Sequence, residues 1–572
     1  MTTDLSAAPY ALAPDQQAWV RDRVAAMPLE AKVGQMFVAH AELDDDSVAL
    51  VRRFQLAGVR PGSGTADEVA AFVDRLNAAS DIPLLVGANL EFGGDGAAKD
   101  GTLIGAPLQC VATGDTATAE DLGRVCAVEG LAAGTNWAFA PVADIHLNWR
   151  NSIASHRAFG DTAEDVAAYA AAYHRGAAAG AAGLGFATCA KHFPGDGVDE
   201  RDQHLVATVN TLDAGEWRAT FGRVYGALIE AGVPTIMVGH IAQPAITRQL
   251  LGDDAPIRPA TLAPELATTL LRDELGFNGV TVTDATHMVG FTSQGRREDL
   301  LVDSVVAGCD LLLFLRDAEA DVEAVLAGAR DGRIAAERVD EAVTRVLALK
   351  VAMGLCGPGA VAHERPRVDR AVHRAIGEDV ARRSATLVID KGVLPLRPET
   401  HRRVRLIVNS ELAGNAEFPI PIEHLPLTRW MAADLERRGF KVSFPEPLPP
   451  VRSLGDYMRV VAEGNVAVEG AFDAAVVVAH YVGGGVQSTV SRLRWPMALG
   501  PAAPWWAGQV PTVFVSFGVP THLADVPMVG ALVNCYTPSE AAVRAAVDGI
   551  VGAEPFLGTA NANAWCGLVD VI

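Results

Sequence analysis

The segment 188–204, TCAKHFPGDGVDERDQH, contains the densest group of side chains in this sequence that could take part in a reaction. It begins in an apolar run and continues into a loop shaped by glycine and proline. Asp202 stands two residues before His204, close enough for the carboxylate to fix the tautomer of the imidazole and raise its basicity. A histidine held in this way suits general acid/base catalysis near neutral pH. A surface Asp–His pair with a purely structural role has the same spacing, so both interpretations stay open here.

A second candidate is Asp284, which directly follows the apolar run 279–283. A carboxylate at the end of a buried strand is typical of a catalytic group, although it could also cap the next helix. Asn89 and Glu91 follow another apolar run, and Arg157 lies in NSIASHRAFGD. Charged and amide groups of this kind suit the hydroxyls of a sugar.

Eight short apolar runs alternate with helix-patterned segments over the first part of the chain. Runs of this type fit parallel strands that are buried on both faces. Eight successive units favour a (β/α)₈ TIM-like barrel over an open doubly wound sheet, and a barrel would bring the polar ends of its strands together on one face. We expect the strands at 33–41, 57–62, 83–91, 135–145, 185–193, 234–241, 278–286 and 309–315.

Start signals of two intervening helices support this alternation. Thr65 with Glu68 predicts a capping box, and Asp161 with Glu164 predicts another. Apolar residues recur at helical spacing after both pairs.

A second alternation of strands and helices follows a segment rich in glycine, proline and charge. We expect a barrel domain over 1–355, a linker over 356–384 and an α/β (αβα) sandwich over 385–572. Four or five parallel strands are expected in the sandwich, at 404–410, 440–444, 474–481, 511–518 and 530–536.

Composition excludes several classes of partner. The 572 residues carry a formal net charge of −22, which disfavours nucleic acid and anionic membranes. No apolar run reaches membrane-spanning length, and the first residues do not resemble a secretory signal, so we expect a cytoplasmic protein. The seven cysteines form no C-x-x-C pair, which argues against a disulfide framework or a zinc knuckle. Nothing in the sequence indicates an oligomeric state.

Together these motifs resemble glycoside hydrolase family 3, and the match is similar to its bacterial two-domain β-N-acetylglucosaminidase branch. The segment KHFPG-x(6)-D-x-H carries the resemblance in content and in spacing. APVADI (140–145), R-x-F-G-D (157–161) and the Thr-Asp pair at 283–284 agree with it. Segments 345–355 and 384–396 look like the family's junction, and 556–562 resembles its closing segment, so the resemblance covers most of the chain.

The resemblance implies a retaining β-N-acetylglucosaminidase that needs no cofactor or metal. Asp284 would be the nucleophile that forms a covalent glycosyl-enzyme, and His204, oriented by Asp202, would be the acid/base. The other implied positions bind the terminal sugar: Asn89, Arg157, Lys191 and His192. Retention normally uses two carboxylic groups, and here an Asp–His dyad would replace the second.

Departures from the family pattern concern the substrate. Asn89 stands where the branch commonly has Asp, which predicts a looser choice of sugar. Asp196 stands where a second His is frequent, and Thr286-His287 replaces the usual acidic residue after the nucleophile. A neutral imidazole would not repel phosphate as a carboxylate would, so inorganic phosphate is a candidate acceptor beside water.

Three alternatives remain from the residues themselves. The first is a β-glucosidase, or an enzyme that accepts both glucosides and N-acetylglucosaminides. The second is a non-catalytic barrel that binds sugar, against which stands the presence of Asp284, Asp202 and His204 together. The third is a zinc site at His192, Asp202 and His204, which no accompanying HExxH or cysteine set supports.

Overall fold

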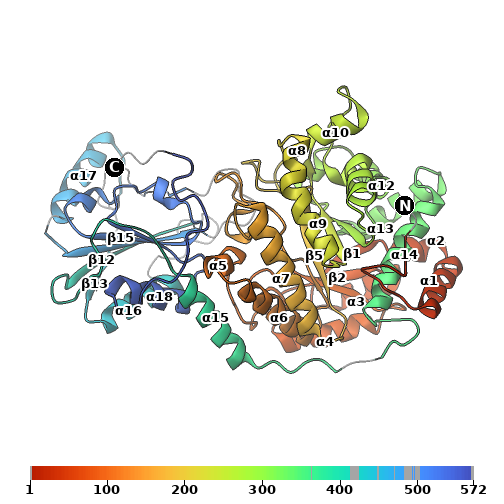
Figure 1. Cartoon of the computed structure of the whole chain (residues 1–572), viewed down its shortest axis with the longest axis horizontal. Helices are drawn as coiled ribbons and strands as arrows, with labels where there is room; N and C mark the ends of the chain where they lie inside the picture. The colour runs from red at the N-terminus through yellow and green to blue at the C-terminus, as the bar shows by residue number, and fades with distance from the viewer. Residues whose placement is uncertain are drawn as a thin grey trace. The chain divides into compact units, whose positions relative to one another are not determined.

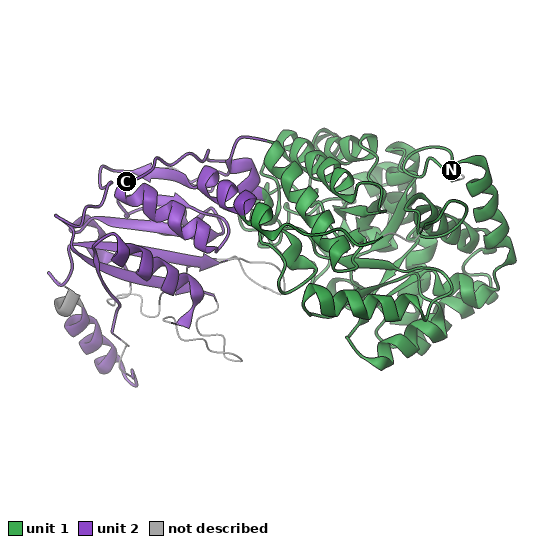
Figure 2. Cartoon of the chain, turned by 90° about the horizontal axis from the view of Figure 1, so that it is seen from below, with its two compact units in different colours: residues 1–107, 116–374, 484–489 green, residues 108–115, 375–483, 490–572 purple. Residues whose placement is uncertain are grey.

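The computed structural model describes residues 3–361, 364–411, 424–446, 450–468, 470–481, 492–493, 495 and 503–568. These residues form two compact units, which Figure 2 draws in different colours. The first unit holds described residues within 1–107 and 116–374, and the second holds those within 108–115, 375–483 and 490–572.

The first unit is a parallel eight-stranded barrel. Its strand order is β10-β1-β2-β3-β4-β5-β7-β9, and a parallel bridge between Val282 and Leu311 joins the last strand to the first. The prediction of a (β/α)₈ barrel with eight strands is therefore confirmed. The strands are β1 Phe37–Ala41, β2 Gly58–Pro61, β3 Leu85–Ala88, β4 Trp137–Ala138, β5 Ala187–Phe193, β7 Thr235–Val238, β9 Val280–Thr283 and β10 Leu312–Leu313; a separate pair is formed by β6 Thr208–Val209 and β8 Ile241–Ala242.

Helices alternate with these strands along the chain (Figure 1). The α-helices are α1 Pro14–Ala26, α2 Leu29–Gly34, α3 Asp45–Phe54, α4 Ala66–Asn77, α6 Ala117–Ala132, α7 Ala163–Ala181, α8 Ala214–Trp217, α9 Arg223–Glu230, α10 Pro244–Leu251, α11 Val289–Thr292, α12 Arg297–Ala307, α13 Ala318–Arg330 and α14 Ala336–Ala352. The 3₁₀-helices are η1 Gly94–Gly96, η2 Ser155–Arg157 and η4 Ala260–Leu262. The π-helices are η3 Arg218–Gly222 and η5 Glu265–Glu274.

The two predicted helix starts have different outcomes. Thr65 and Glu68 form the expected capping box of α4, with each side chain accepting from the other's backbone N–H. The prediction for α7 was wrong by one residue, since Thr162 caps the helix by accepting from the Asp165 N–H. Two adjacent side chains there can both act as caps, and only the backbone path decides between them.

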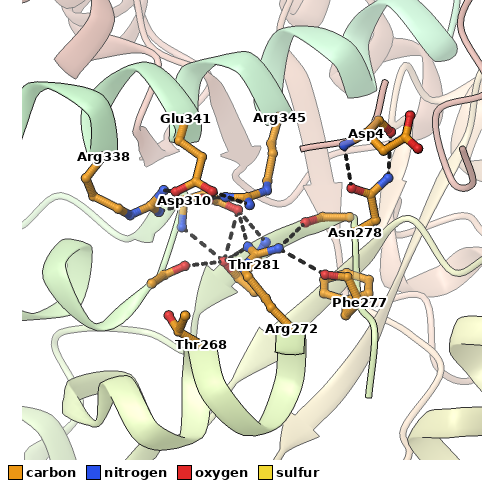
Figure 3. Close-up of polar contacts among 12 residues, drawn as sticks. Asp4, Thr268, Arg272, Phe277, Asn278, Thr281, Asp310, Arg338, Glu341 and Arg345 are labelled. Atoms are coloured by element: carbon orange, nitrogen blue, oxygen red, sulfur yellow. Dashed lines mark hydrogen bonds and ion pairs between the residues drawn. The ribbon is translucent and has the colours of Figure 1, made fainter. Parts of the chain in front are cut away.

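A buried charge network closes the end of the barrel where the strands begin (Figure 3). Both carboxylate oxygens of Asp310 are engaged: Oδ2 accepts from Arg272 at 2.7 Å, and Oδ1 accepts from Arg338 at 2.6 Å and Arg345 at 3.3 Å. The Thr281 N–H also donates to Oδ2 at 3.0 Å. Burial acts to raise the pKa of Asp310, but the three guanidinium groups outweigh it and hold that pKa well below its usual range. The network ties α14 to β9 and β10 at the end opposite the predicted site.

The second unit contains a six-stranded sheet in the order β11-β16-β15-β14-β12-β13. All neighbouring pairs are parallel except β11 with β16. The unexpected strand is β11, which adds an antiparallel edge to the five expected strands. Its strands are β11 Thr386–Asp390, β12 Arg403–Ser410, β13 Lys441–Ser443, β14 Ala474–Tyr481, β15 Thr512–Gly518 and β16 Ala531–Asn534. The accompanying helices are α5 Pro107–Ala112, α15 Arg370–Ser384, α16 Pro426–Arg437, α17 Leu454–Val468 and α18 Glu540–Val551, with η7 Trp505–Gly508 and η8 His522–Ala524.

Two apolar layers cover the faces of this sheet. Met431 of α16 and Val547 of α18 belong to the layer on one face, and Trp506 and Leu523 belong to the layer on the other. The unit is thus the layered α/β domain that the second alternation predicted.

The borders of the two units differ from the expected 355 and 385. The segment expected as a linker, 356–384, ends in helix α15, and its residues up to Arg374 group with the barrel. Residues 108–115 group with the second unit, where Ala112 O accepts from the Thr559 N–H and Leu108 O accepts from Asn561 Nδ2. A segment from the early part of the chain thus belongs to the second unit, and the composition of the sequence does not indicate this.

Candidate active site

The predicted site residues lie where barrel strands end. Asn89 follows β3, Lys191 and His192 lie in the last part of β5, and Asp284 directly follows β9. Asp202 and His204 lie on the loop after β5, and Arg157 closes η2. The carboxyl ends of barrel strands form the face on which barrel enzymes carry their chemistry.

A buried carboxylate, Glu91, holds two of the predicted sugar-binding cations. Its Oε2 accepts from Arg157 Nε at 2.8 Å, and its Oε1 accepts from Arg157 Nη2 at 2.7 Å. Lys191 Nζ lies 2.5 Å from the same Oε1. Burial acts to raise the pKa of Glu91, but the charges and hydrogen bonds of Arg157 and Lys191 hold it well below its usual range. Glu91 is therefore ionised, and it fixes both cations in one place.

His192 stands between two carboxylates. Its Nδ1 lies 2.7 Å from Oδ2 of Asp144, whose Oδ1 accepts from the His192 N–H at 3.0 Å. Its Nε2 lies 3.9 Å from Oδ2 of Asp284. A buried carboxylate on Nδ1 favours the proton on that nitrogen and orients the ring. Asp144 therefore determines that the Nε2 edge of the ring faces Asp284.

Asp284 is a partly accessible carboxylate with its charged form favoured. Its Oδ1 accepts from the Ala285 N–H at 2.7 Å, and 13% of its side chain is exposed. Burial acts to raise its pKa, but the nearby His192, His240 and His204 and the Ala285 N–H hold the pKa below its usual value. An ionised carboxylate with one oxygen free to approach a ligand is the form that a nucleophile needs.

Asp202 and His204 form the expected close pair. His204 Nδ1 lies 2.6 Å from Asp202 Oδ1, which also accepts from the His204 N–H at 2.8 Å. The Asp202 side chain is fully buried, whereas 34% of the His204 side chain is exposed. Burial acts to lower the pKa of His204, but the hydrogen bond and charge of Asp202 and the charge of Asp284 raise it above its usual value.

Hydrogen bonds that involve the backbone attach the loop with Asp202 and His204 to the barrel. The Val289 N–H donates to His204 O at 2.8 Å, and Oε1 of the buried Gln203 accepts from the His240 N–H at 2.9 Å. His240 itself contacts Ala285 O through Nε2 at 3.1 Å. The loop after β5 is thus packed against the segments that follow β7 and β9.

Asp196 is a buried residue whose backbone N–H donates to Asp144, the carboxylate that orients His192. Its Oδ1 accepts from Asn151 Nδ2 at 2.7 Å and from the Gly197 N–H at 2.6 Å, while its buried Oδ2 has no hydrogen-bond partner within the described chain. Burial and the neighbouring charge of Asp144 raise the pKa of Asp196 to about 7.

Asn89 is the one predicted site residue that the described contacts do not tie to the others. Its side chain is exposed at the end of β3. Arg157 and Lys191 meet at Glu91, His192 faces Asp284, and the charge of Asp284 acts on the pKa values of Arg157 and His204.

Three supporting residues had no predicted role: Asp144, Gln203 and His240. Asp144 lies near the end of the fourth apolar run and His240 near the end of the sixth, so the same rule that selected Asp284 would have found both. Gln203 acts through a contact with the backbone of His240, which has no signal in the sequence.

Within the described part of the chain, no cluster of three or more His, Cys, Asp or Glu side chains is placed to hold a metal ion. None of the described helices combines the length and the apolar character that a membrane span requires.

Comparison with known proteins places this arrangement in a family. Residues 28–349 match the family described as glycosyl hydrolase family 3 N terminal domain. A relative from Cellulomonas fimi, named β-N-acetylglucosaminidase/β-glucosidase, is 39% identical over 574 residues, with 99% of each chain covered. A β-hexosaminidase of Vibrio cholerae serotype O1 is 30% identical over 259 residues, which cover 45% of this chain and 73% of that one.

A solved structure is similar over the whole length. The β-glucoside phosphorylase BglX, solved with bound 2FGlc, superposes with a TM-score of 0.87 at 36% identity, and 99% of each chain is covered. The resemblance drawn from the KHFPG-x(6)-D-x-H segment is confirmed. This chain belongs to glycoside hydrolase family 3.

Proposed function

We propose that the protein is a retaining β-N-acetylglucosaminidase that also accepts β-glucosides, with Asp284 as nucleophile and His204 as acid/base. The observation that carries the proposal is the presence together of an ionised Asp284 at the end of β9 and of His204, whose pKa is raised by its partner Asp202. The name of the Cellulomonas fimi relative, at 39% identity over the full length, supports both sugars.

The terminal sugar would be held by the cations around Glu91. Arg157 and Lys191 each keep donors beyond those that Glu91 accepts, and a sugar's hydroxyls can take these. His192, oriented by Asp144, would contact the sugar near the carbon that Asp284 attacks. Asn89 offers an exposed amide in place of a carboxylate, which fits a site that tolerates more than one sugar.

In the first step, an Asp284 carboxylate oxygen forms a bond to the anomeric carbon while the bond from that carbon to the leaving oxygen breaks. His204 gives its Nε2 proton to the leaving oxygen and stays hydrogen-bonded to Asp202 through Nδ1. The raised pKa of His204 favours the protonated ring that this step needs.

In the second step, an acceptor oxygen attacks the anomeric carbon and the bond to Asp284 breaks. Neutral His204 takes the acceptor's proton and returns to its starting form. Water gives the free sugar, and phosphate gives a sugar 1-phosphate. The name of the similar structure, a β-glucoside phosphorylase, favours phosphate as a second acceptor, and a neutral imidazole does not repel it.

We also propose a cytoplasmic location. All seven cysteines are free, as is usual for proteins kept in a reducing compartment.

The test is to incubate the protein with nitrophenyl β-N-acetylglucosaminide and β-glucoside, each with and without inorganic phosphate, and to identify products by NMR. We expect release of both sugars with the β configuration in the first product formed, and a sugar 1-phosphate when phosphate is present. Inversion at the anomeric carbon, or no turnover of either glycoside, would overturn the proposal. Asp284→Asn serves as the blank for contaminating activity.

A further inference from the structure

Arg60 is a charged side chain at the mouth of the barrel that the site described above does not use. It lies in β2, near the end of that strand, and its side chain is half-buried. Among the described residues, its guanidinium forms no hydrogen bond and no ion pair. Burial lowers the pKa of this guanidinium, and no carboxylate of the described residues raises it. A partly buried arginine without a counter-ion is costly unless an anion binds to it.

Arg60 lies close enough to the imidazoles of His40 and His287 for its charge to act on their pKa values. His40 is its direct partner across the β1–β2 ladder, and side chains of paired residues lie on one face of a sheet. The ring of His40 lies against that of Phe314, with centroids 3.8 Å apart and the ring planes tilted by 35°. The ring of His287 lies 6.1 Å from His40 and 6.3 Å from Phe314.

These four residues come from adjacent strands of the barrel. His287 follows β9, Phe314 follows β10, His40 lies in β1 and Arg60 lies in β2. These strands are consecutive around the ring once the β9–β10 bridge is counted. Glu91, Arg157, Lys191 and His192, in contrast, follow or belong to the arc from β3 to β5. Arg60 and its neighbours therefore occupy the arc on the other side of Asp284.

Charges in this arc favour an anion. Burial, together with Arg60 and His287, lowers the pKa of His40 to about 4, and burial also lowers the pKa of His287. Both imidazoles are therefore neutral near pH 7 and can donate from a ring N–H, while Arg60 supplies a full positive charge. His287 is close enough to the catalytic groups for Asp284 and His204 to act on its pKa.

We propose that Arg60, flanked by His40 and His287, binds the oxyanion of the group that enters or leaves opposite Asp284. A guanidinium offers paired donors that match two oxygens of a phosphate or a carboxylate, which makes arginine suited to this task. The inference rests on the proposed function for the identity of the reaction. Two sources can supply the oxyanion: free inorganic phosphate as acceptor, or an acidic group on the aglycone.

The test compares the wild-type protein with Arg60→Gln and Arg60→Lys. Arg316→Gln is the matched control, because Arg316 is an exposed arginine two residues after Phe314. In the first arm, sugar 1-phosphate formation is measured against phosphate concentration. In the second, kcat/KM is compared for an N-acetylglucosaminide with a carboxylated aglycone and for its methyl ester. In the third, inorganic phosphate is titrated into each protein by calorimetry, which requires no turnover.

We expect Arg60→Gln to raise the KM for phosphate, or to remove the preference for the carboxylate over its ester, by roughly 10- to 100-fold, as for loss of a charge-assisted hydrogen bond. Arg60→Lys should keep part of the effect, and Arg316→Gln should change neither quantity by more than about twofold. An effect of Arg60→Gln in the first arm only identifies phosphate as the source of the oxyanion. An effect in the second arm only identifies the acidic aglycone as that source.

The inference is overturned if the wild type shows neither phosphate dependence nor a preference for the acid, or if Arg60→Gln matches the wild type in all three arms. Absence of any glycosidase activity would instead overturn the proposed function. In that case, phosphate binding by the wild type and its loss in Arg60→Gln would still support the anion site.

Discussion

The Nδ1 atom of His204 lies 2.6 Å from Oδ1 of Asp202, and the same oxygen accepts from the backbone N–H of His204. One fully buried carboxylate therefore fixes both the ring and the backbone of a histidine that is itself one-third exposed. The arrangement leaves Nε2 as the atom that can exchange a proton with a ligand.

Replacement of His204 by Ala should affect substrates according to their leaving group. Sugar–sugar linkages leave poorly without a proton, so their turnover should fall by about 10²–10⁴-fold. The first step on nitrophenyl glycosides should be affected far less, because an acidic phenol leaves without help. Steady-state and burst kinetics on both kinds of substrate measure the difference, and azide should restore part of the lost turnover.

Asp202→Ala should show the same pattern with a smaller loss, of roughly 10- to 100-fold, since it removes the orienting group and leaves the proton carrier. Asp199→Ala, in the same loop, is the control. Equal losses on good and poor leaving groups in both His204 and Asp202 variants would show that the dyad only supports the loop.

Glu91 should be important for stability as well as for the sugar site. Glu91→Ala leaves two buried cations without their carboxylate, and breaking such a pair typically costs about 3–5 kcal/mol in the free energy of unfolding. Chemical denaturation measures this loss. Glu319→Ala is the matched control, because its pair with Arg53 is exposed and should contribute less than about 1 kcal/mol. Similar losses in both variants would contradict the role given to Glu91.

Asp196 should make the protein less stable as the pH rises. Its pKa is about 7 in the folded chain and 3.8 in the reference state, so the folded chain binds the extra proton between these values. The associated stability is complete below about pH 4 and is lost by about pH 7. Asp196→Asn keeps an acceptor for Asn151 and removes the titration, so its unfolding free energy should fall less than the wild type's between pH 4 and 8. Parallel profiles would contradict this assignment.

Lys350 should have the opposite effect at higher pH. Its ammonium group is fully buried and donates to Gln35 Oε1 at 2.8 Å. Burial lowers its pKa to about 7 from 10.5, so the unfolded chain binds more protons between these values and stability should rise with pH there. Lys350→Met should flatten this rise in denaturation profiles from pH 7 to 10, whereas Lys441→Met, at an exposed position, should not.

The barrel could be predicted from the sequence because buried parallel strands appear as nearly continuous apolar runs. All eight expected runs contain one strand of the barrel. The antiparallel strand β11 was missed, since Thr386–Asp390 lies at an edge of the sheet and is partly exposed. The cap of α7 was misplaced by one residue because Asp161 and Thr162 have similar capping ability.

The site could be predicted where one short segment contains both partners, as Asp202 and His204 do. The contacts of Glu91 with Arg157 and Lys191 could not, because they join residues 66 or more positions apart through the closure of the barrel. Asp144 could have been selected by the rule that selected Asp284, since both lie near the ends of expected strands. That Arg60 has no ion-pair partner among the residues the structure describes depends on what its neighbours lack, and spacing in a sequence does not report that.

The central claim is that Asp284 forms a bond to the sugar. The most direct measurement is mass spectrometry of the protein after reaction with a slow 5-fluoro N-acetylglucosaminyl fluoride, followed by digestion and peptide sequencing. We expect one sugar attached to Asp284 in the wild type and none in Asp284→Asn. A label on another residue, or an oxazoline product with no label, would contradict the account and favour participation of the substrate's own acetamido group.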